Sequence, residues 1–261
     1  MKIEAYILAY NEAETIGLTI KHYQQFCDRV VIFDNFSTDE TRDIALSMGC
    51  DVRLFGIKGV LSDKEYLKVK NQCWKESKAD WVIVCDADEI LWHPDLTSVL
   101  LEDCTIMTTY GWNVYSEDVP FENWLEITKG YHDGNYSKSV IFSPSKIKEI
   151  NYHYGCHNNS PKGDVRFSEE VLTLFHYRNV GGYERLSKRH AMYRERLSKE
   201  NKEIGLGIHY LFSETQRKLE WYQHYENCGE YVPPGGSYVS PQIQNLSPGL
   251  RSAVLANLGK V

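Results

Sequence analysis

The first hundred residues alternate short apolar runs with segments whose apolar residues recur at helical spacing. Continuous apolar runs of this length are typical of strands buried on both faces, as in a parallel sheet. Strands that alternate with helices predict a mainly parallel sheet with helices on both of its faces. We expect strands at Ile3–Ala9, Arg29–Phe33, Cys50–Phe55 and Trp81–Cys85, and helices from about Asn11 to Tyr23, at Glu40–Met48 and at Lys64–Ser77.

Beyond residue 104 the pattern changes. Strand-like runs occur at Thr105–Tyr110, Ser139–Phe142 and Val171–His176, with a long polar and aromatic segment between the first two. Glycines at 181 and 182 then precede segments with helical spacing. We expect an α/β domain at 1–180, with halves at 1–104 and 105–180, and a helical extension at 181–261; its helices are predicted at Tyr183–Asn201, Ile208–Cys228 and, at the end, Gly249–Leu258.

Composition and charge narrow the functional classes. The chain has 261 residues, of which 42% are hydrophobic and 25% charged, as in ordinary globular proteins. The net charge of −7 and a pI of about 5.7 disfavour nucleic acid as a partner. Seven scattered cysteines without a Cys-x-x-Cys pair predict free thiols in a cytoplasmic protein. We expect no signal peptide and no membrane span, because the chain opens on a strand-like run and lacks about 20 consecutive apolar residues.

The fourth predicted strand runs directly into two carboxylates, Asp86 and Asp88. Alternate residues of a strand point the same way, so the two side chains can converge beyond the strand end. Ligands of open α/β sheets bind at that edge. Carboxylate oxygens are the preferred ligands of Mg²⁺ and suit Mn²⁺, and either ion can hold a phosphate. The pattern therefore predicts a divalent-metal site.

Two other predicted strands also end in polar groups, at Ala9-Tyr10-Asn11-Glu12 and at Asp34-Asn35-x-Ser37-x-Asp39. Together with Asp86-x-Asp88-Glu89, these motifs resemble the nucleotide-sugar half of the GT-A glycosyltransferases, in particular the family 2-like enzymes. The resemblance is close over residues 3–92 and weaker to about residue 200. It implies a GT-A fold and a metal-dependent enzyme that moves a sugar from a nucleotide-diphospho-sugar, expected to be UDP-linked, to a glycan or glycolipid acceptor. Family analogy further suggests inversion at the anomeric carbon and a role in surface polysaccharide or lipopolysaccharide synthesis.

The resemblance also implies roles for individual residues. Asp34 would accept from a ring N–H of uracil, and Asp88 would bind Mn²⁺ or Mg²⁺ directly. Asp86 would face the ribose or a metal-bound water, and His176, at the end of an apolar run, would be a further metal ligand. The remaining residues expected around the nucleotide and its phosphates are Ala9, Asn11, Glu12, Asn35, Lys70, Ala87 and Lys138.

Inversion requires one general base that takes a proton from the acceptor hydroxyl. Related enzymes use an Asp or Glu, and several lie in the long polar segment. Asp118 is favoured, Glu122 and Asp133 are rivals, and spacing leaves the choice open. Trp112 and His157 are expected to face the acceptor.

Residues 185–199 carry six Lys and Arg side chains on a predicted helix. We expect a solvated face paired with glutamates, with peripheral membrane contact through the C-terminal helices as the alternative. Three rival functions remain: a metal-dependent phosphatase that uses Asp86 and Asp88, a nucleotidyltransferase, and a non-catalytic protein that binds a sugar or nucleotide. The order and surroundings of the motifs disfavour the first two.

Overall fold

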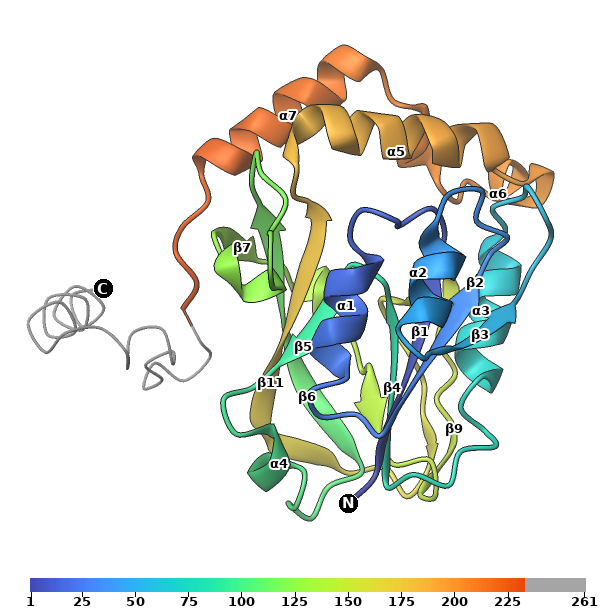
Figure 1. Cartoon of the computed structure of the whole chain (residues 1–261), viewed down its shortest axis with the longest axis vertical. Coiled ribbons are helices and arrows are strands. Elements are labelled where there is room, and N and C mark those ends of the chain that lie inside the picture. Colours follow the sequence, from blue (N-terminus) through green and yellow to red (C-terminus); the bar gives the residue numbers. More distant parts are fainter. Residues whose placement is uncertain (233–261) are drawn as a thin grey trace, which may run out of the picture.

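The first hundred residues of the computed structural model, which describes residues 1–232, contain the predicted alternation of strand and helix (Figure 1). The strand ladder β3-β2-β1-β4 is parallel throughout. Its register places Ala9 beside Asp34, and Leu8 beside Asp86, so the motif-bearing ends share one edge. The elements are β1 (Ile3–Ala9), α1 (Ile16–Tyr23), β2 (Arg29–Asp34), α2 (Thr41–Ser47), β3 (Asp51–Leu54), α3 (Asp63–Gln72) and β4 (Trp81–Asp86).

The sheet continues beyond β4 with mixed strand directions. β8 is antiparallel to both β4 and β6, β6 and β11 are parallel, and β5 is antiparallel to β11. A mainly parallel sheet is thus confirmed for the first half, while the second half adds antiparallel strands. These elements are β5 (Glu89–Trp92), α4 (Leu96–Val99), β6 (Ile106–Tyr115), β7 (Gly130–His132), β8 (Ile141–Phe142), β9 (Ile147–Glu149), β10 (Lys162–Gly163) and β11 (Phe167–Asn179), with short 3₁₀ turns η1 (Trp124–Glu126), η2 (Gly134–Tyr136) and η3 (Tyr154–Cys156).

The helices after residue 180 are shorter than predicted. α5 ends at Arg196 because the chain there pairs with the loop before α3: the Leu61 N–H donates to the Arg196 carbonyl (2.7 Å) and the Ser198 N–H to the Leu61 carbonyl (2.9 Å). The helix predicted over 208–228 is interrupted, and the Ser213 side chain caps a new one. The elements are α5 (Gly182–Arg196), α6 (Lys199–Glu203), η4 (Ile208–Leu211) and α7 (Glu214–Glu226). The helix predicted at 249–258 lies outside the described residues.

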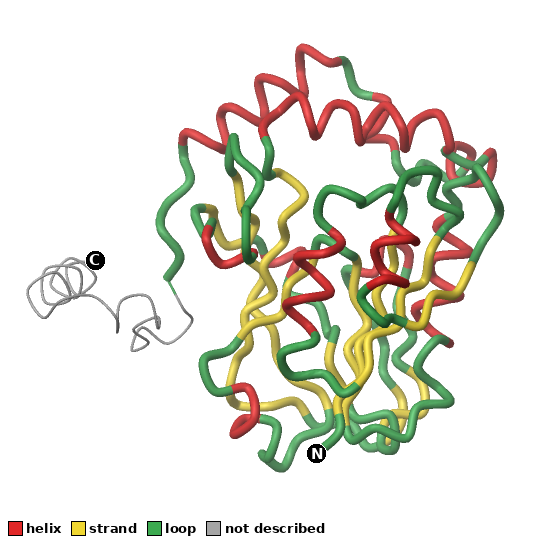
Figure 2. Tube along the Cα trace, in the orientation of Figure 1, coloured by secondary structure: helices red, strands yellow, loops and turns green. Residues whose placement is uncertain are grey.

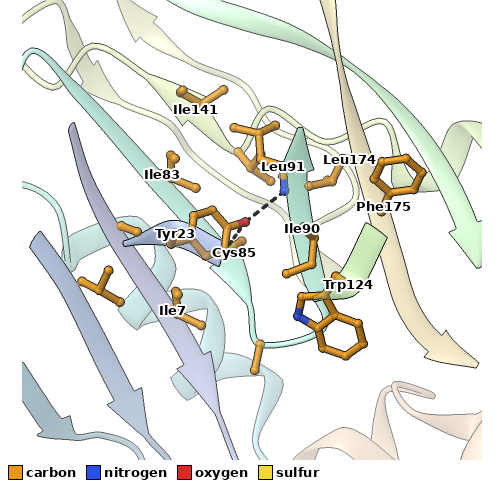
Figure 3. Packing of buried hydrophobic residues seen from close by; sticks show 14 of the residues in the cluster. Ile7, Tyr23, Ile83, Cys85, Ile90, Leu91, Trp124, Ile141, Leu174 and Phe175 are labelled. Atoms are coloured by element: carbon orange, nitrogen blue, oxygen red, sulfur yellow. Dashed lines mark hydrogen bonds between the residues drawn. The ribbon is translucent and has the colours of Figure 1, made fainter. Parts of the chain in front are cut away.

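Both faces of the sheet are buried. Along β1, Ile7 packs into the core with α1 and α2, whereas Tyr6 and Leu8 point into a second core with α3. In the first core, the Tyr23 hydroxyl donates to the Glu89 carbonyl (2.8 Å) and accepts from the Leu91 N–H (3.1 Å), which fixes β5 against α1 (Figure 3). The residues between β4 and β5 are thereby held in one position.

The helical segment covers one end of the sheet. Figure 2 shows α5 and α7 crossing above the strand ends, and Figure 1 shows that this is the end at which the loops after β1 and β2 lie. None of the helices within residues 1–232 combines the length and apolar character needed to cross a bilayer. All seven cysteines carry free thiols, as expected.

Candidate active site

A cavity of about 230 Å³ lies at the carboxyl ends of β1 and β4. Ala9, Glu12 and Ala87 contribute to its wall from the strand-end loops, and α3, β11, α5 and η4 supply the remaining sides. Ligands of open α/β sheets bind at this edge. The predicted place of the site therefore coincides with the cavity.

The two aspartates occupy the tight turn between β4 and β5. The Ala87 N–H donates to the carbonyl of Leu8 (3.0 Å), and the Asp88 carbonyl accepts from the N–H of Tyr177 (2.8 Å). β1 and β11 thus hold the turn from both sides. Asp86 and Asp88 both line the cavity, as the strand pattern predicted.

Two lysines neutralise carboxylates at this turn. Lys70, from α3, donates to Asp86 Oδ2 (2.8 Å), and Lys138 pairs with Glu89, which is 1% exposed. Burial disfavours the charge of Glu89, but the two lysines outweigh it and hold its pKa well below the usual range. Burial, together with Glu89, raises the pKa of Asp86 despite Lys70. Lys70 and Lys138 are buried in the site, but each already has an anionic partner.

A hydrogen-bonded chain fixes the orientation of His176. The Asp133 carboxylate can only accept, so Asn113 turns its Nδ2 toward Asp133 Oδ2 (3.0 Å) and its Oδ1 toward His176 Nδ1 (2.9 Å). The proton of the neutral imidazole therefore lies on Nδ1. The lone pair on Nε2 then faces Asp88 Oδ1 at 3.9 Å. Burial lowers the pKa of His176 to about 4 although Asp88 favours its charge, so the ring is neutral at pH 7.

The arrangement of Asp88 and His176 fits a divalent cation. Two acceptors that face each other at 3.9 Å cannot bond directly, so both keep a lone pair for a cation. Neighbouring ligands of an octahedral ion with bonds of about 2.1 Å lie about 3.0 Å apart, so a bound ion would draw the two side chains together. Within residues 1–232, no three His, Cys, Asp or Glu side chains gather closely enough to hold a metal by themselves. Mg²⁺-type sites commonly use one or two protein ligands and complete their shell with phosphate and water. Arg189 donates to the other oxygen, Asp88 Oδ2 (3.2 Å), and to Glu12 Oε1 (2.6 Å).

Asp34 is fully buried beside the cavity rather than on its wall. Its Oδ2 accepts from the Ser37 N–H (3.0 Å), and Arg42 lies 4.0 Å away. Its Oδ1 is buried without a hydrogen-bond partner in the described part of the chain. A buried carboxylate oxygen without a partner is costly, so this atom is suited to an N–H donor from a ligand.

Arg196 lies between the cavity and the end of β2. Its guanidinium is 3.1 Å from the centre of the Tyr10 ring, and its Nη2 donates to the side-chain oxygen of Asn35. The Asn35 Nδ2 in turn donates to the Phe55 carbonyl (2.9 Å). A planar cation thus covers the aromatic face next to Asp34.

The loop after β1 connects these parts. Asn11 does not line the cavity; its Oδ1 accepts from the Thr38 N–H (2.8 Å) and ties the loop after β1 to that after β2. Asn11 has a positive φ of 51°, which Asn tolerates better than most residues. Glu12 is buried, and burial raises its pKa although Arg189 opposes the shift.

The carboxylates predicted as general bases do not line the cavity. Asp118 is exposed, and its backbone carbonyl accepts from the N–H of Gly181. Glu122 is also exposed, and its backbone carbonyl accepts from Lys21 Nζ. Asp133 points to Asn113 instead. The long segment pairs with β6 through β7 and contacts the start of α5 through Ser116 and Asp118, and none of these three carboxylates lines the cavity. The geometry gives no support to Asp118 or Glu122 as the base and makes Asp133 a positioning residue.

The two predicted acceptor residues are separated. Trp112 is 6% exposed in the core, where its Nε1 donates to the Thr128 carbonyl (2.9 Å), and it does not line the cavity. His157 does line it. A carbonyl only accepts, so the bond of 2.7 Å to the Asn135 carbonyl places the proton on Nδ1 and leaves a lone pair on Nε2. Burial and Lys138 lower the pKa of His157, which favours its neutral form.

The family model for glycosyl transferase family 2 matches residues 5–161, more than half of the chain. The chain belongs to glycosyl transferase family 2. Residues 5–161 therefore form a glycosyltransferase family 2 domain, and the match includes the ends of β1, β2 and β4 but not β11 or α5.

Curated relatives match a shorter stretch of this glycosyltransferase. An uncharacterized glycosyltransferase of Rickettsia bellii is 36% identical over 90 residues, and RP128 of Rickettsia prowazekii, also an uncharacterized glycosyltransferase, is 33% identical over 90 residues. Each match covers 34% of this chain and 29% of the relative. The chain thus spans less than a third of the length of these relatives.

Among solved structures, glucosyl-3-phosphoglycerate synthase from Mycobacterium tuberculosis is 19% identical, covering 42% of this chain and 44% of its own, with a TM-score of 0.32. Mannosyl-3-phosphoglycerate synthase from Rubrobacter xylanophilus is also 19% identical, covering 42% of this chain and 40% of its own, with a TM-score of 0.33.

Sequence reasoning missed the arginines of this glycosyltransferase that reach its site. The basic run on α5 was expected to be solvated, but Arg189 and Arg196 are 9% and 8% exposed and contact the strand-end loops. Residues 185, 189 and 196 share one face of a helix with 3.6 residues per turn, and this spacing could have revealed them. Arg178, two residues after His176, also lines the cavity.

Proposed function

We propose that this family 2 enzyme transfers a sugar from a UDP-sugar to a hydroxyl of a glycan or glycolipid acceptor, with Mn²⁺ or Mg²⁺ held by Asp88 and His176. The single observation that carries the proposal is the pair of acceptors, Asp88 Oδ1 and His176 Nε2, that face each other at 3.9 Å at the sheet edge. A divalent cation bound there would neutralise the charge that develops on the departing diphosphate.

Asp34 and Tyr10 support the proposal that the nucleoside of the donor is uridine. Asp34 Oδ1 lacks a partner and can accept the single ring N–H of uracil. The Tyr10 ring offers a face on which the base can stack, which is worth about 1–3 kcal/mol per base in nucleic-acid sites. Arg196 now covers that face, so the base needs Arg196 to move aside.

The proton of the acceptor hydroxyl needs a base in the cavity. We assign this role to His157, whose Nε2 carries a lone pair and whose Nδ1 is anchored on the Asn135 carbonyl. A single base is what transfer with inversion requires. On the donor side, Lys70 and Lys138 remain paired with carboxylates, so they set the local charge and hold the turn that carries Asp88.

The surface next to the cavity suits an acceptor carried on a membrane. In η4, Tyr210 lines the cavity, while Ile208, Leu211 and Phe212 are exposed beside it. Exposed apolar groups of this kind can enter the boundary of a bilayer. We therefore place the enzyme in the cytoplasm, in peripheral contact with the membrane, and in the synthesis of a surface polysaccharide or lipopolysaccharide. The division at residue 180 is proposed as functional too, with 181–261 as an extension whose described part, residues 181–232, closes the site.

The first test is a thermal-shift panel of UDP, GDP, CMP and dTDP, each with and without Mn²⁺. A ligand at 100 times its dissociation constant stabilises a protein by about 2.7 kcal/mol, which such a scan detects. We expect a shift with UDP that depends on Mn²⁺ and is lost in Asp88→Asn. The matched control is Asp103→Asn, whose side chain is 93% exposed outside the cavity, and it should keep the shift. An unchanged shift in Asp88→Asn would refute the metal assignment.

A further inference from the structure

The cationic side chains of the cavity wall differ in whether a carboxylate is paired with them. Four cationic side chains line it: Lys70, Lys138, Arg178 and Arg189. Three of them have carboxylate partners within 4.0 Å: Lys70 pairs with Asp86, Lys138 pairs with Glu89, and Arg189 pairs with both Glu12 and Asp88. Within the part of the chain that the structure describes, the Arg178 side chain has neither an ion pair nor a hydrogen bond. Its Nε is buried without a partner, as are Nε and Nη1 of Arg189, whose Nη2 is paired.

Arg178 is held in the cavity by its strand. β11 places His176 and Arg178 on the cavity side, while Tyr177 between them is fully buried in the core against Trp124. Alternate residues on a strand are about 7 Å apart. The free guanidinium therefore lies one side-chain spacing from the proposed metal ligand, on the wall to which η4 contributes.

A second group near Arg178 also lacks a partner. His209 of η4 lines the cavity, and its Nε2 is buried without a hydrogen bond to any described residue. Burial and the nearby charge of Arg178 lower the pKa of His209 to about 4, so the ring is neutral at pH 7 and can donate from one nitrogen. An unpaired guanidinium and an unsatisfied ring nitrogen in one wall are both costly unless a ligand completes them.

We propose that Arg178 and His209 bind an oxyanion of the acceptor, a phosphate or a carboxylate, so that the acceptor of this enzyme is an anionic molecule. The proposal rests on the proposed function and specifies its substrate. Guanidinium groups pair with such oxyanions in bidentate fashion. The spacing of about 7 Å along the strand places the bound anion close to the proposed metal ligand His176.

The donor is the less suitable partner for Arg178. The proposed cation beside Asp88 already neutralises a diphosphate, and Arg189, which touches Asp88 directly, is the nearer arginine. The groups that act on the charge of Arg178 are Tyr136 of η2 and Tyr210 of η4, followed by Asp88 and Arg189, so Arg178 lies between the proposed cation site and the side of the cavity formed by η2 and η4.

The experiment measures anion binding to the full chain. Inorganic phosphate and, separately, acetate are titrated calorimetrically into wild type, Arg178→Gln and Arg178→Lys, with and without saturating UDP and Mn²⁺. The matched control is Arg194→Gln, which removes an exposed arginine of α5. We expect saturable binding of at least one anion to wild type, about tenfold weaker in Arg178→Gln. Arg178→Lys should retain part of the affinity, and the control all of it.

Three results would overturn the proposal: no binding of either anion to wild type, equal binding to Arg178→Gln, or a loss of UDP affinity in Arg178→Gln as large as the loss of anion affinity. The last result would make Arg178 a ligand of the donor. If UDP fails to bind every form, the proposed function fails, yet the nucleotide-free titrations still show whether Arg178 holds an anion. Preference for phosphate or for acetate identifies the oxyanion.

Discussion

The two walls of the cavity use charge differently. On the wall formed by β4, α3 and the segment before β8, each lysine is paired with a carboxylate, as in Lys70–Asp86 and Lys138–Glu89. On the wall formed by β11, α5 and η4, Arg178 and His209 have buried atoms without partners. Burying a paired charge is tolerated, whereas burying an unpaired group is costly. The first wall is therefore complete without a ligand, and the second is built to receive one.

The contrast indicates that the two walls bind different parts of the substrates. The paired wall fixes the turn that carries Asp86 and Asp88, and its internal pairs make that turn rigid. The wall from β11 and α5 contacts the same turn through His176 and Arg189. Rigid placement suits a metal and a diphosphate, and unsatisfied donors suit recognition of a specific acceptor.

The largest effect on stability is expected when the Lys138–Glu89 pair loses its lysine. Lys138→Met leaves the buried Glu89 without its ion-pair partner, with only the more distant charge of Lys70 to oppose burial, which should lower the free energy of unfolding by about 3–5 kcal/mol in urea titrations. The double variant Lys138→Met/Glu89→Gln should recover much of the loss, since no bare charge remains. Lys146→Met, at an exposed position, is the control. Equal stability of Lys138→Met and wild type would show that the pair does not hold the turn.

A smaller effect is expected where the hydrogen bonds from Asp133, just after β7, reach the proposed metal ligand His176 through Asn113. Asp133→Asn allows Asn113 to reverse its amide, so His176 loses its fixed tautomer. Changes in such outer partners typically weaken metal binding by about 10–100-fold. Calorimetric titration with Mn²⁺ in the presence of UDP measures this, and Asp118→Asn, on an exposed loop, should bind as wild type does. Unchanged affinity in Asp133→Asn would exclude the positioning role.

Arg196 of α5, which covers the Tyr10 ring, predicts a variant that binds more tightly instead of less tightly. Arg196→Ala uncovers the Tyr10 ring, so the uracil base no longer has to displace a guanidinium. We expect UDP to bind about tenfold more tightly, a difference of about 1.4 kcal/mol. Arg194→Ala on the exposed side of α5 is the control. Weaker binding in Arg196→Ala would instead mean that Arg196 contacts the nucleotide.

The last expected effect is a dependence of stability on pH. Burial, together with Arg178, Arg217 and His209, lowers the pKa of His190 to about 2, against about 6.5 in an unfolded chain. Below pH 6.5 the unfolded chain gains a proton that the folded chain refuses, so stability falls as the pH drops, by up to about 1.4 kcal/mol per unit. His190→Gln should flatten the dependence between pH 6.5 and 4, measured by urea titration. His153→Gln, at an exposed position, should keep the wild-type slope.

The sequence predicted the wall of β1, β2 and β4 well because its chemistry is local. Each polar group follows its own apolar strand, and parallel strands bring their carboxyl ends to one edge. Asp86, Asp88, Ala9 and Glu12 therefore lie at the cavity, and Asp34 beside it. Lys70 of α3 and Lys138 also line the cavity, as the resemblance implied. The carboxylates predicted as general bases do not, for the converse reason. Residues 116–133 have no periodicity, so their carboxylates could not be placed, and they lie away from the cavity.

The sequence by itself determined the α/β plan, the edge of the sheet that carries the site, and the family of transferases, since all three follow from strand periodicity and short motifs. Only the tertiary structure decided that α5 turns Arg189 and Arg196 inward, that Asn113 and Asp133 set the proton of His176, and that Arg178 lacks a partner. These contacts join residues 20 to 177 positions apart. The partners in these contacts come from segments far apart in the sequence, so no sequence spacing predicts which residues meet.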